Sequence, residues 1–168
     1  GRIGHILKCD HCGKEYDYLE NGQLKCLNGE TKFDYPSKWY YWEKECVKKE
    51  IEDGTYFFED DVRVEELIGA KIGFVPKEGK FHLTHSIKDG IQVTSDNDFY
   101  FHRSSLQSYA IHIEYNYLGR GAFIELSTTT ETYFVYPLNK PNYITKIHFA
   151  VEHIYDYLKK DMRKEEND

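Results

Sequence analysis

The chain has 168 residues, with 22 Lys and Arg against 29 Asp and Glu and a formal net charge of −7. This balance argues against a general nucleic-acid-binding protein and against electrostatic binding to an acidic membrane surface, because both depend on clustered cations. Aromatic residues make up 16% of the chain, and their large buried areas supply a core, which excludes wholesale disorder. No apolar run approaches the roughly 18 residues that span a bilayer, and no secretory signal is evident.

The first 34 residues hold three of the four cysteines and predict a zinc-ribbon-like module. The string from Cys9 to Gly13 reads Cys-Asp-His-Cys-Gly, the form of a zinc knuckle in which two thiolates bind one ion from a tight turn. A hairpin through Asn21-Gly22 then returns a third thiol. We therefore expect Cys9, Cys12 and Cys26 to be ligands of one structural zinc ion.

The fourth ligand of this zinc site is open. Gly29 stands where a second knuckle would have its second cysteine, whereas a closed structural site needs four ligands. The candidates are Cys46, His11 and His5. The first alternative is a metal-free hairpin with buried thiols, because unpaired cysteine is commonly buried. Disulfides are a further alternative, although nothing else in the sequence suggests export.

Residues 35–53 predict a connecting helix. Pro36 suits a first helical turn, because its missing N–H would have no partner there. Gly54 follows the helix, since glycine readily adopts the left-handed conformation of a C-terminal cap. Apolar side chains recur at spacings of three and four along the helix, at Trp39, Trp42, Cys46, Val47 and Ile51.

Residues 54 to about 137 predict an antiparallel sheet, because apolar and polar side chains alternate there with period two. Asp89-Gly90 is a hairpin turn between two such runs, and a second turn lies at Leu118 to Gly121. Together with one earlier strand, near 55–58 or 71–75, we expect about six or seven strands.

The end of the chain predicts an amphipathic helix that begins near Ile144. Its apolar stripe consists of Ile147, Val151, Ile154 and Leu158, extended by Tyr155 and Met162. Residues 164–168 carry no apolar side chain and are expected to form a frayed tail.

This order of elements predicts a mainly β chain of the α+β class. Antiparallel strands followed by one helix are similar to the pleckstrin-homology and GRAM-like barrel, in which the helix plugs the open corner between two near-orthogonal sheets. We expect a zinc-ribbon-like module over 1–34, the helix over 35–53, and the barrel with its helix over 54–163.

Two further groups of side chains are candidates for binding or catalysis. His82, His85 and His102 lie on neighbouring predicted strands and can cluster, although scattered surface or packed histidines are the more common outcome. His112 is expected to point outward from its strand. Lysines flank the turn before one strand, where some lipid-binding barrels hold phosphates, but Glu78 lies among them and favours a solvated loop; these lysines are Lys71, Lys77 and Lys80.

Several strings resemble a known family: Cys9-Asp-His-Cys-Gly, Tyr18-Leu-Glu-Asn-Gly22 with Lys25-Cys26, Trp39 to Glu43, Ser108-Tyr-Ala-Ile-His-Ile-Glu-Tyr-Asn-Tyr-Leu-Gly-Arg-Gly121, and Glu125-Leu-Ser-Thr128. They are similar to the segment that follows the catalytic domain in a group of bacterial 1-acyl-sn-glycerol-3-phosphate acyltransferases. These enzymes transfer an acyl chain to lysophosphatidic acid in phospholipid biosynthesis. The resemblance covers nearly the whole chain.

The resemblance implies that the catalytic part of such an enzyme lies outside this sequence. The family's chemistry rests on a His-x-x-x-x-Asp motif, in which the carboxylate orients the histidine as a general base. One match exists, from His5 to Asp10, and we reject it because Asp10 lies inside the thiol-rich knuckle. The family's phosphate-binding block is absent, so no catalytic or cofactor-binding residue carries over.

The function implied by the resemblance is that of a non-catalytic accessory domain for docking, regulation or lipid sensing. Its partners would be the upstream acyltransferase domain and, through the parent protein, a lipid or membrane surface. Its location would be cytoplasmic, at the cytoplasmic face of the membrane. The alternative is an independent module that binds a small ligand or a peptide. An enzyme in its own right is disfavoured, because no nucleophile, base and orienting group can be paired from the sequence.

Overall fold

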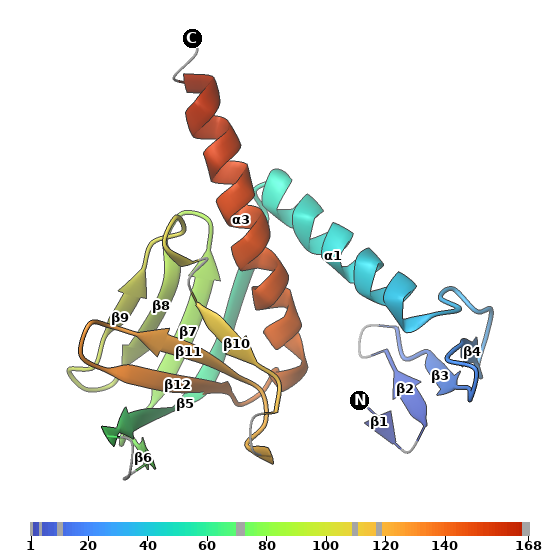
Figure 1. Cartoon of the computed structure of the whole chain (residues 1–168), viewed down its shortest axis with the longest axis horizontal. Helices are drawn as coiled ribbons and strands as arrows, with labels where there is room; N and C mark the ends of the chain where they lie inside the picture. Colours follow the sequence, from blue (N-terminus) through green and yellow to red (C-terminus); the bar gives the residue numbers. More distant parts are fainter. Residues whose placement is uncertain are drawn as a thin grey trace. The chain divides into compact units, whose positions relative to one another are not determined.

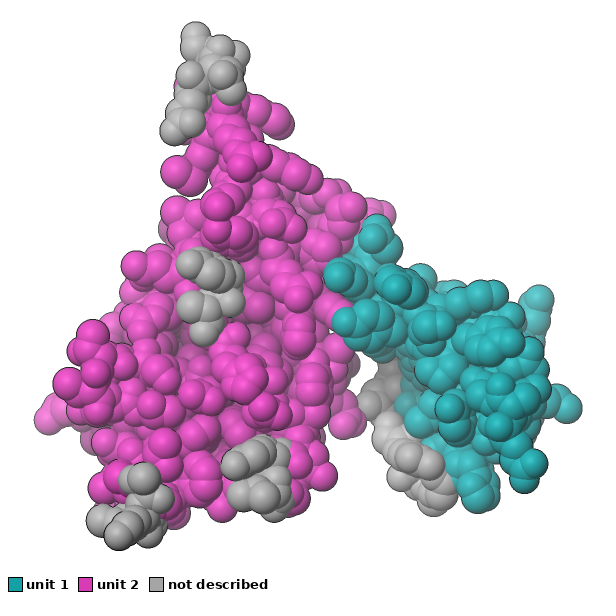
Figure 2. Space-filling model, viewed as in Figure 1, with its two compact units in different colours: residues 1–46 teal, residues 47–168 magenta. Residues whose placement is uncertain are grey.

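The structure is a computed structural model that describes residues 2–3, 5–9, 12–69, 73–108, 111–116 and 119–165. The described chain is mainly β, with a small sheet, a larger curled antiparallel sheet and a long C-terminal helix (Figure 1). It divides into two compact units, residues 1–46 and 47–168 (Figure 2). Each unit has its own hydrophobic core.

The sheet of the first unit has the order β1-β2-β3-β4, and its neighbouring strands are antiparallel. These strands are β1 (Arg2–Ile3), β2 (Ile6–Lys8), β3 (Glu15–Tyr18) and β4 (Leu24–Cys26). Tyr16 lies opposite Cys26 and is buried with Cys26 and Leu24 on one face. Phe33 and Trp39 cover this face, with the Trp39 ring 5.1 Å from Tyr16 and 5.6 Å from Phe33. The hairpin therefore has a small aromatic core.

The predicted connecting helix is present as α1 (Pro36–Glu52). Its apolar side chains pack in the cores of both units. Trp39, near its start, packs in the core of the first unit, whereas Val47 and Ile51 are buried in the core of the second. The boundary between the units accordingly falls within α1, between Cys46 and Val47.

The sheet of the second unit contains eight strands within the described residues. They are β5 (Phe57–Ile68), β6 (Gly73–Pro76), β7 (Phe81–Ser86), β8 (Gly90–Ser95), β9 (Phe101–Arg103), β10 (His112–Glu114), β11 (Phe123–Ser127) and β12 (Thr132–Pro137). The order is β10-β11-β12-β5-β7-β8-β9, and β6 pairs with β5 beside this path. The sheet has more strands than the predicted six or seven, because the chain forms a strand both near 55–58, as β5, and near 71–75, as β6.

Both predicted hairpins are confirmed. β7 and β8 pair around the turn at Asp89-Gly90, with His85 opposite Ile91. β10 and β11 pair around the second turn, with Ile113 opposite Ile124; Leu118 of that turn lies outside the described residues. Period-two alternation on both sides of a glycine-bearing turn was therefore a sound signal for antiparallel pairing.

The helix α3 (Ile144–Glu165) follows a short 3-10 turn, η3 (Pro141–Tyr143), and packs on one face of the curled sheet. Figure 1 shows α3 in red along the sheet. Ile147, Val151 and Ile154 are buried in the core as predicted, and Leu158 is partly buried against it. Met162 is exposed, so the buried stripe ends before it. Lys164 and Glu165, expected in the frayed tail, are helical, and residues 166–168 lie outside the description.

A buried carboxylate anchors the approach to α3. Asp60 of β5 accepts hydrogen bonds from the backbone N–H groups of Asn139 (3.1 Å) and Lys140 (2.8 Å) and from the Asn139 side-chain amide (3.0 Å). A buried charge is tolerable when hydrogen bonds replace its water. The turn that leads into α3 is therefore held to the first strand of the sheet.

The opposite face of the same sheet carries a second aromatic cluster, formed by Phe74, Phe123, Phe134 and Tyr136. Glu65 is buried beside it and accepts hydrogen bonds from Arg63, Arg120 and the Tyr136 hydroxyl. Burial by itself would raise the pKa of Glu65, but the hydrogen bonds from Arg120 and Arg63 hold it below its ordinary value. This outer cluster ties β5, β6, β11 and β12 together.

Candidate functional sites

The first candidate site is the turn between β2 and β3. The Cys9 N–H donates to the Lys14 carbonyl (2.8 Å), and the Gly13 N–H donates to the Cys9 carbonyl (2.9 Å), so the backbone folds back tightly. The pKa of the exposed Cys12 thiol is lowered, first by a hydrogen bond from the Lys14 backbone and second by hydrogen bonding with the Cys9 side chain. This turn can therefore present a thiolate to a soft metal ion.

The turn that follows β4 lies at the same end of the small sheet, because β2 ends, β3 begins and β4 ends there. Asn28 links the two turns: its Oδ1 accepts from the Glu15 N–H (2.9 Å) and its Nδ2 donates to the Gly13 carbonyl (3.3 Å). The Cys26 sulfur lies 3.6 Å from Asn28 Oδ1. Sequence reasoning missed Asn28; its position inside the incomplete second knuckle was the available signal.

The structure places Cys9 and Cys12 in one tight turn and buried Cys26 at the same end of the sheet. Within the described residues, no three Cys, His, Asp or Glu side chains converge on a metal position. The Tyr18 N–H donates to the His5 carbonyl, so His5 lies at the opposite end of the β2–β3 pair. His11 lies outside the described residues. The three-thiol zinc site therefore stays a prediction.

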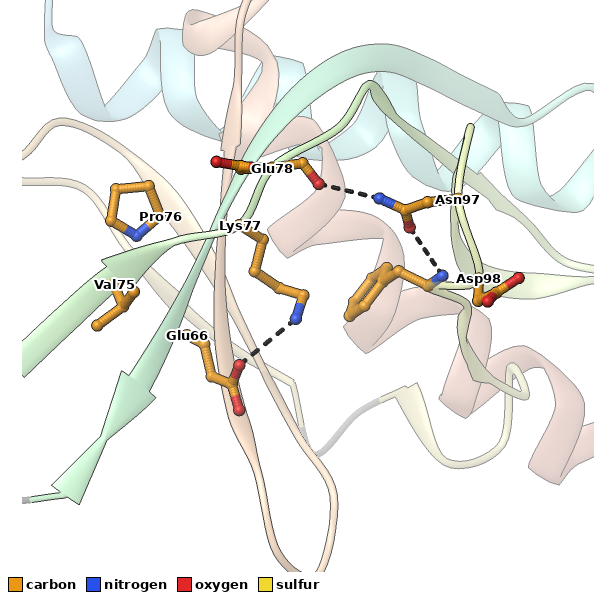
Figure 3. Close-up of a pocket in the computed structure, with 8 residues that line it drawn as sticks. Glu66, Val75, Pro76, Lys77, Glu78, Asn97 and Asp98 are labelled. Atoms are coloured by element: carbon orange, nitrogen blue, oxygen red, sulfur yellow. Dashed lines mark hydrogen bonds and ion pairs between the residues drawn. The ribbon is translucent and has the colours of Figure 1, made fainter.

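The second candidate site is an open pocket of about 540 Å³ in the second unit (Figure 3). Its walls come from the β5–β6 pair and from the segments that precede β7 and β9. The lining residues are Glu66, Val75, Pro76, Lys77, Glu78, Asn97, Asp98 and Phe99. Residues 75–78 and 97–99 are about twenty positions apart in the sequence, so no local motif could have predicted the pocket.

Of the two described lysines among the three considered for phosphate, Lys77 lines this pocket and Lys80 does not. The Lys77 ammonium lies 3.4 Å from Glu66 Oε2, so the charge is already paired. Lys71 lies outside the described residues, and the Lys80 backbone N–H donates to Asp96 (2.9 Å). With Glu78 and Asp98 in the lining, the surroundings disfavour an anion.

His82, His85 and His102 do not cluster, so the scattered arrangement that was the more common expectation is the one found. Alternation along β7 sends His85 into the core and His82 to the opposite face, where its Nδ1 lies 2.9 Å from Asp61 and its Nε2 3.2 Å from Glu59. His102 instead contacts the Asp89 carbonyl (2.8 Å). The register places His85 on the opposite face from His82, and His102 lies on the face of His82 but two strands away, across β8.

His112 and His148 form separate surface contacts. His112 points outward as predicted, 3.3 Å from both Glu114 and Glu125. His148 of α3 lies 3.1 Å from the Tyr115 hydroxyl and 3.5 Å from Glu152. The Tyr115–His148 contact joins the loop after β10 to α3, a juxtaposition that no sequence spacing indicated.

Comparison of the chain with protein-family models, with curated proteins and with solved structures finds no match. None of the helices in the described part of the chain is long and apolar enough to cross a membrane. Function must therefore be argued from the residues and their geometry.

Proposed function

We propose that this chain is a non-catalytic accessory module of a bacterial 1-acyl-sn-glycerol-3-phosphate acyltransferase, as its sequence resemblance implies. The supporting observation is that the segment which most resembles this family, and which ends at Gly121, forms part of the larger sheet. Its described residues 111–116 and 119–121 contain β10 and part of the turn toward β11, and Arg120 donates to Glu65 and Tyr136 of the outer cluster. These residues build the sheet, which is the role expected of a folded accessory domain.

The curled sheet supports the same proposal. Its seven-strand path is antiparallel throughout, β5 occupies the middle of the path, and the C-terminal helix follows the last strand after the short turn η3. This order agrees with a pleckstrin-homology-like barrel. α3 fills the concave face with apolar side chains, so ligands have access at the loops that end the strands. Docking or ligand sensing at such loops is the role we assign to the module.

The second candidate function is an independent ligand-binding module, and the pocket around Lys77 is the observation that favours it. The two proposals differ in the protein to which the module belongs, and they share the same binding surface. The reading frame upstream of residue 1 separates them: an encoded acyltransferase domain supports the first, and an unrelated domain supports the second.

The isolated chain is expected to show no transfer of acyl groups to lysophosphatidic acid. The reaction needs a base at the acceptor hydroxyl, a stabilised oxyanion and a cationic grip on the phosphate. The measurement is incubation of the purified chain with an acyl donor and lysophosphatidic acid, followed by quantification of the product. Turnover above background that disappears in the His5→Ala variant would contradict the proposal and restore the rejected motif as an active site.

We further propose that Cys9, Cys12 and Cys26 hold one structural zinc ion. The supporting observations are the tight turn that holds Cys9 and Cys12, the lowered pKa of Cys12 and the position of the third thiol at the same end of the sheet. A bound ion would cross-link the two turns that Asn28 already joins by hydrogen bonds. Its role would be folding stability of the first unit.

Protein purified without chelator is expected to contain about one zinc ion per chain. Elemental analysis and native mass spectrometry measure the stoichiometry. Cys9→Ser is expected to abolish retention of the ion and to lower the melting temperature, while Cys46→Ser and His11→Ala test the two remaining candidates for the fourth ligand. Full stoichiometric zinc in Cys9→Ser would exclude this site, and a metal-free wild-type protein would identify the turn as a metal-free hairpin.

A further inference from the structure

The pocket of the second unit already surrounds an ammonium group. The Lys77 side chain extends into it, and Nζ lies 3.4 Å from Glu66 Oε2 (Figure 3). The same nitrogen lies 5.4 Å from the ring centroid of Phe99 and 5.7 Å from that of Tyr133. A cation within about 6 Å of an aromatic face is attracted by the ring's negative π cloud. One carboxylate and two rings therefore form a cage for an ammonium ion.

The frame of this cage is held in place by hydrogen bonds. The Asn97 side chain donates to the Glu78 carbonyl (2.9 Å) and accepts from the Phe99 N–H (2.9 Å) and the Ser95 hydroxyl (2.7 Å). Phe99 is also packed edge to face on Tyr133, at a centroid separation of 5.0 Å. The aromatic wall and the acidic rim are therefore positioned before any ligand arrives, which reduces the entropic cost of binding.

The lining of the pocket carries an excess of negative charge. Glu66, Glu78 and Asp98 contribute carboxylates, and Lys77 contributes the lining's one cation. Within the described part of the chain, the carboxylates of Glu78 and Asp98 have no ion-pair partner. The exposed rim is screened by water, but it still favours cations over anions. The apolar surfaces of Val75 and Pro76 lie beside these charges and can contact methylene groups.

We propose that this pocket binds a small organic ammonium compound with more than one charge on an aliphatic chain, of the polyamine class. One ammonium group takes the place of the Lys77 ammonium against Glu66 and Phe99. A second pairs with the rim carboxylates, and the intervening methylene groups lie on the apolar wall. Lys77 is the internal occupant of the cage, and its flexible stem lets it swing out to solvent when the ligand enters.

This inference rests on the pocket alone and is independent of the resemblance to acyltransferases. The chemistry it requires is two ammonium groups joined by methylene groups, which spermidine supplies. Vesicles of phosphatidylethanolamine are the opposing probe, because each headgroup carries one ammonium group beside an anionic phosphate. Saturable binding of spermidine without flotation of the protein on the vesicles supports the polyamine, and flotation on the vesicles without binding of spermidine overturns it.

The experiment is a titration of the whole chain with spermidine, followed by backbone amide NMR. The expected result is saturable shifts at Lys77, Asn97 and Phe99. Magnesium chloride at equal ionic strength is the control for charge alone, and inorganic phosphate is the control for anion binding. Neither control is expected to reproduce these shifts, because magnesium keeps its waters and gains nothing from the rings, and phosphate meets three carboxylates.

Two variants change the affinity in opposite directions. Lys77→Met empties the cage and is expected to tighten spermidine binding about tenfold, whereas Glu66→Gln removes its carboxylate and is expected to weaken binding about tenfold. Asp98→Asn is a second weakening variant if Glu66→Gln does not fold. Asp156→Asn, an exposed carboxylate on α3, is the matched control and is expected to bind like the wild type.

The outcomes are separable. Tighter binding by Lys77→Met with weaker binding by Glu66→Gln supports the cage. The proposal is overturned if the folded Lys77→Met variant binds spermidine no more tightly than the wild type. It is equally overturned if magnesium or phosphate reproduces the shifts at Asn97 and Phe99, or if spermidine does not bind.

Discussion

Among the glycine-to-alanine substitutions in the described part of the second unit, Gly90→Ala is expected to lower the free energy of unfolding the most. Gly90 begins β8 with φ +70°, and a Cβ built there would lie 2.0 Å from the carbonyl oxygen of Arg103. Backbone atoms of Ser104 and Ser105 would lie 2.9 Å away. These atoms belong to the end of β9 and the segment after it, so they cannot move without disturbing the β8–β9 pair. We expect a loss of about 3 to 5 kcal/mol from the clash and the left-handed backbone together.

Urea denaturation of Gly90→Ala against the wild type measures this loss. Gly119→Ala is the matched control, because Gly119 has the same φ of +70° and no atom within 4 Å of a built Cβ. The control is expected to cost only the backbone part, about 1 to 2 kcal/mol. Equal losses in the two variants would show that the close approach at Gly90 does not contribute.

The second large effect expected is a loss of stability in acid that depends on His85. The side chain of His85 is fully buried, and its Nδ1 lies 2.9 Å from the hydroxyl of Tyr56. Its Nε2 has no hydrogen-bond partner among the described residues. Burial lowers the pKa of His85 from 6.5 to about 3, because the core cannot solvate an imidazolium. The ring is therefore neutral in the folded protein over most of the acidic range.

Proton linkage sets the sign of this effect. Between pH 6.5 and 3 the unfolded chain binds a proton at His85 and the folded chain does not. The stability that this group contributes is therefore present above pH 6.5 and is lost as the pH falls, by up to about 1.4 kcal/mol per pH unit. Denaturation curves across this range are expected to show the slope in the wild type and a shallower slope in His85→Leu. Identical slopes would contradict the assignment.

His82, three positions away on β7, supplies an opposite control. Hydrogen bonding to Asp61 chiefly raises the pKa of His82, and together with a smaller effect from Glu59 it outweighs the opposing effect of burial. Its contribution is therefore complete below the ordinary pKa and is lost as the pH rises through the raised value. His82→Gln is expected to lose stability relative to the wild type in mild acid and to match it in alkali. Two histidines on one strand thus respond to pH in opposite directions.

The elements with a regular pattern could be predicted from the sequence. The helix expected over 35–53 is present as Pro36–Glu52, and the helix expected near Ile144 begins there. β7 and β8 were predicted because apolar side chains alternate around Asp89-Gly90. β5 was largely missed, because half of its twelve residues are charged and only its first residues have the pattern of a strand. The buried charges of β5 are stabilised by hydrogen bonds on both faces of the sheet: Asp60 accepts from Asn139 and Lys140, and Glu65 accepts from two arginines.

Periodicity along the chain determined which residues are helical or extended, because backbone spacing decides which side chains share a face. Only the tertiary structure decided what covers each face. In the folded chain, Glu65 is buried beside two arginines, and His82 and His85 lie on opposite faces of the sheet. Asn28 joins the two turns of the small sheet. Residues 75–78 and 97–99 meet around the Lys77 ammonium. These outcomes depend on strand register and on contacts between distant segments, which no local pattern records.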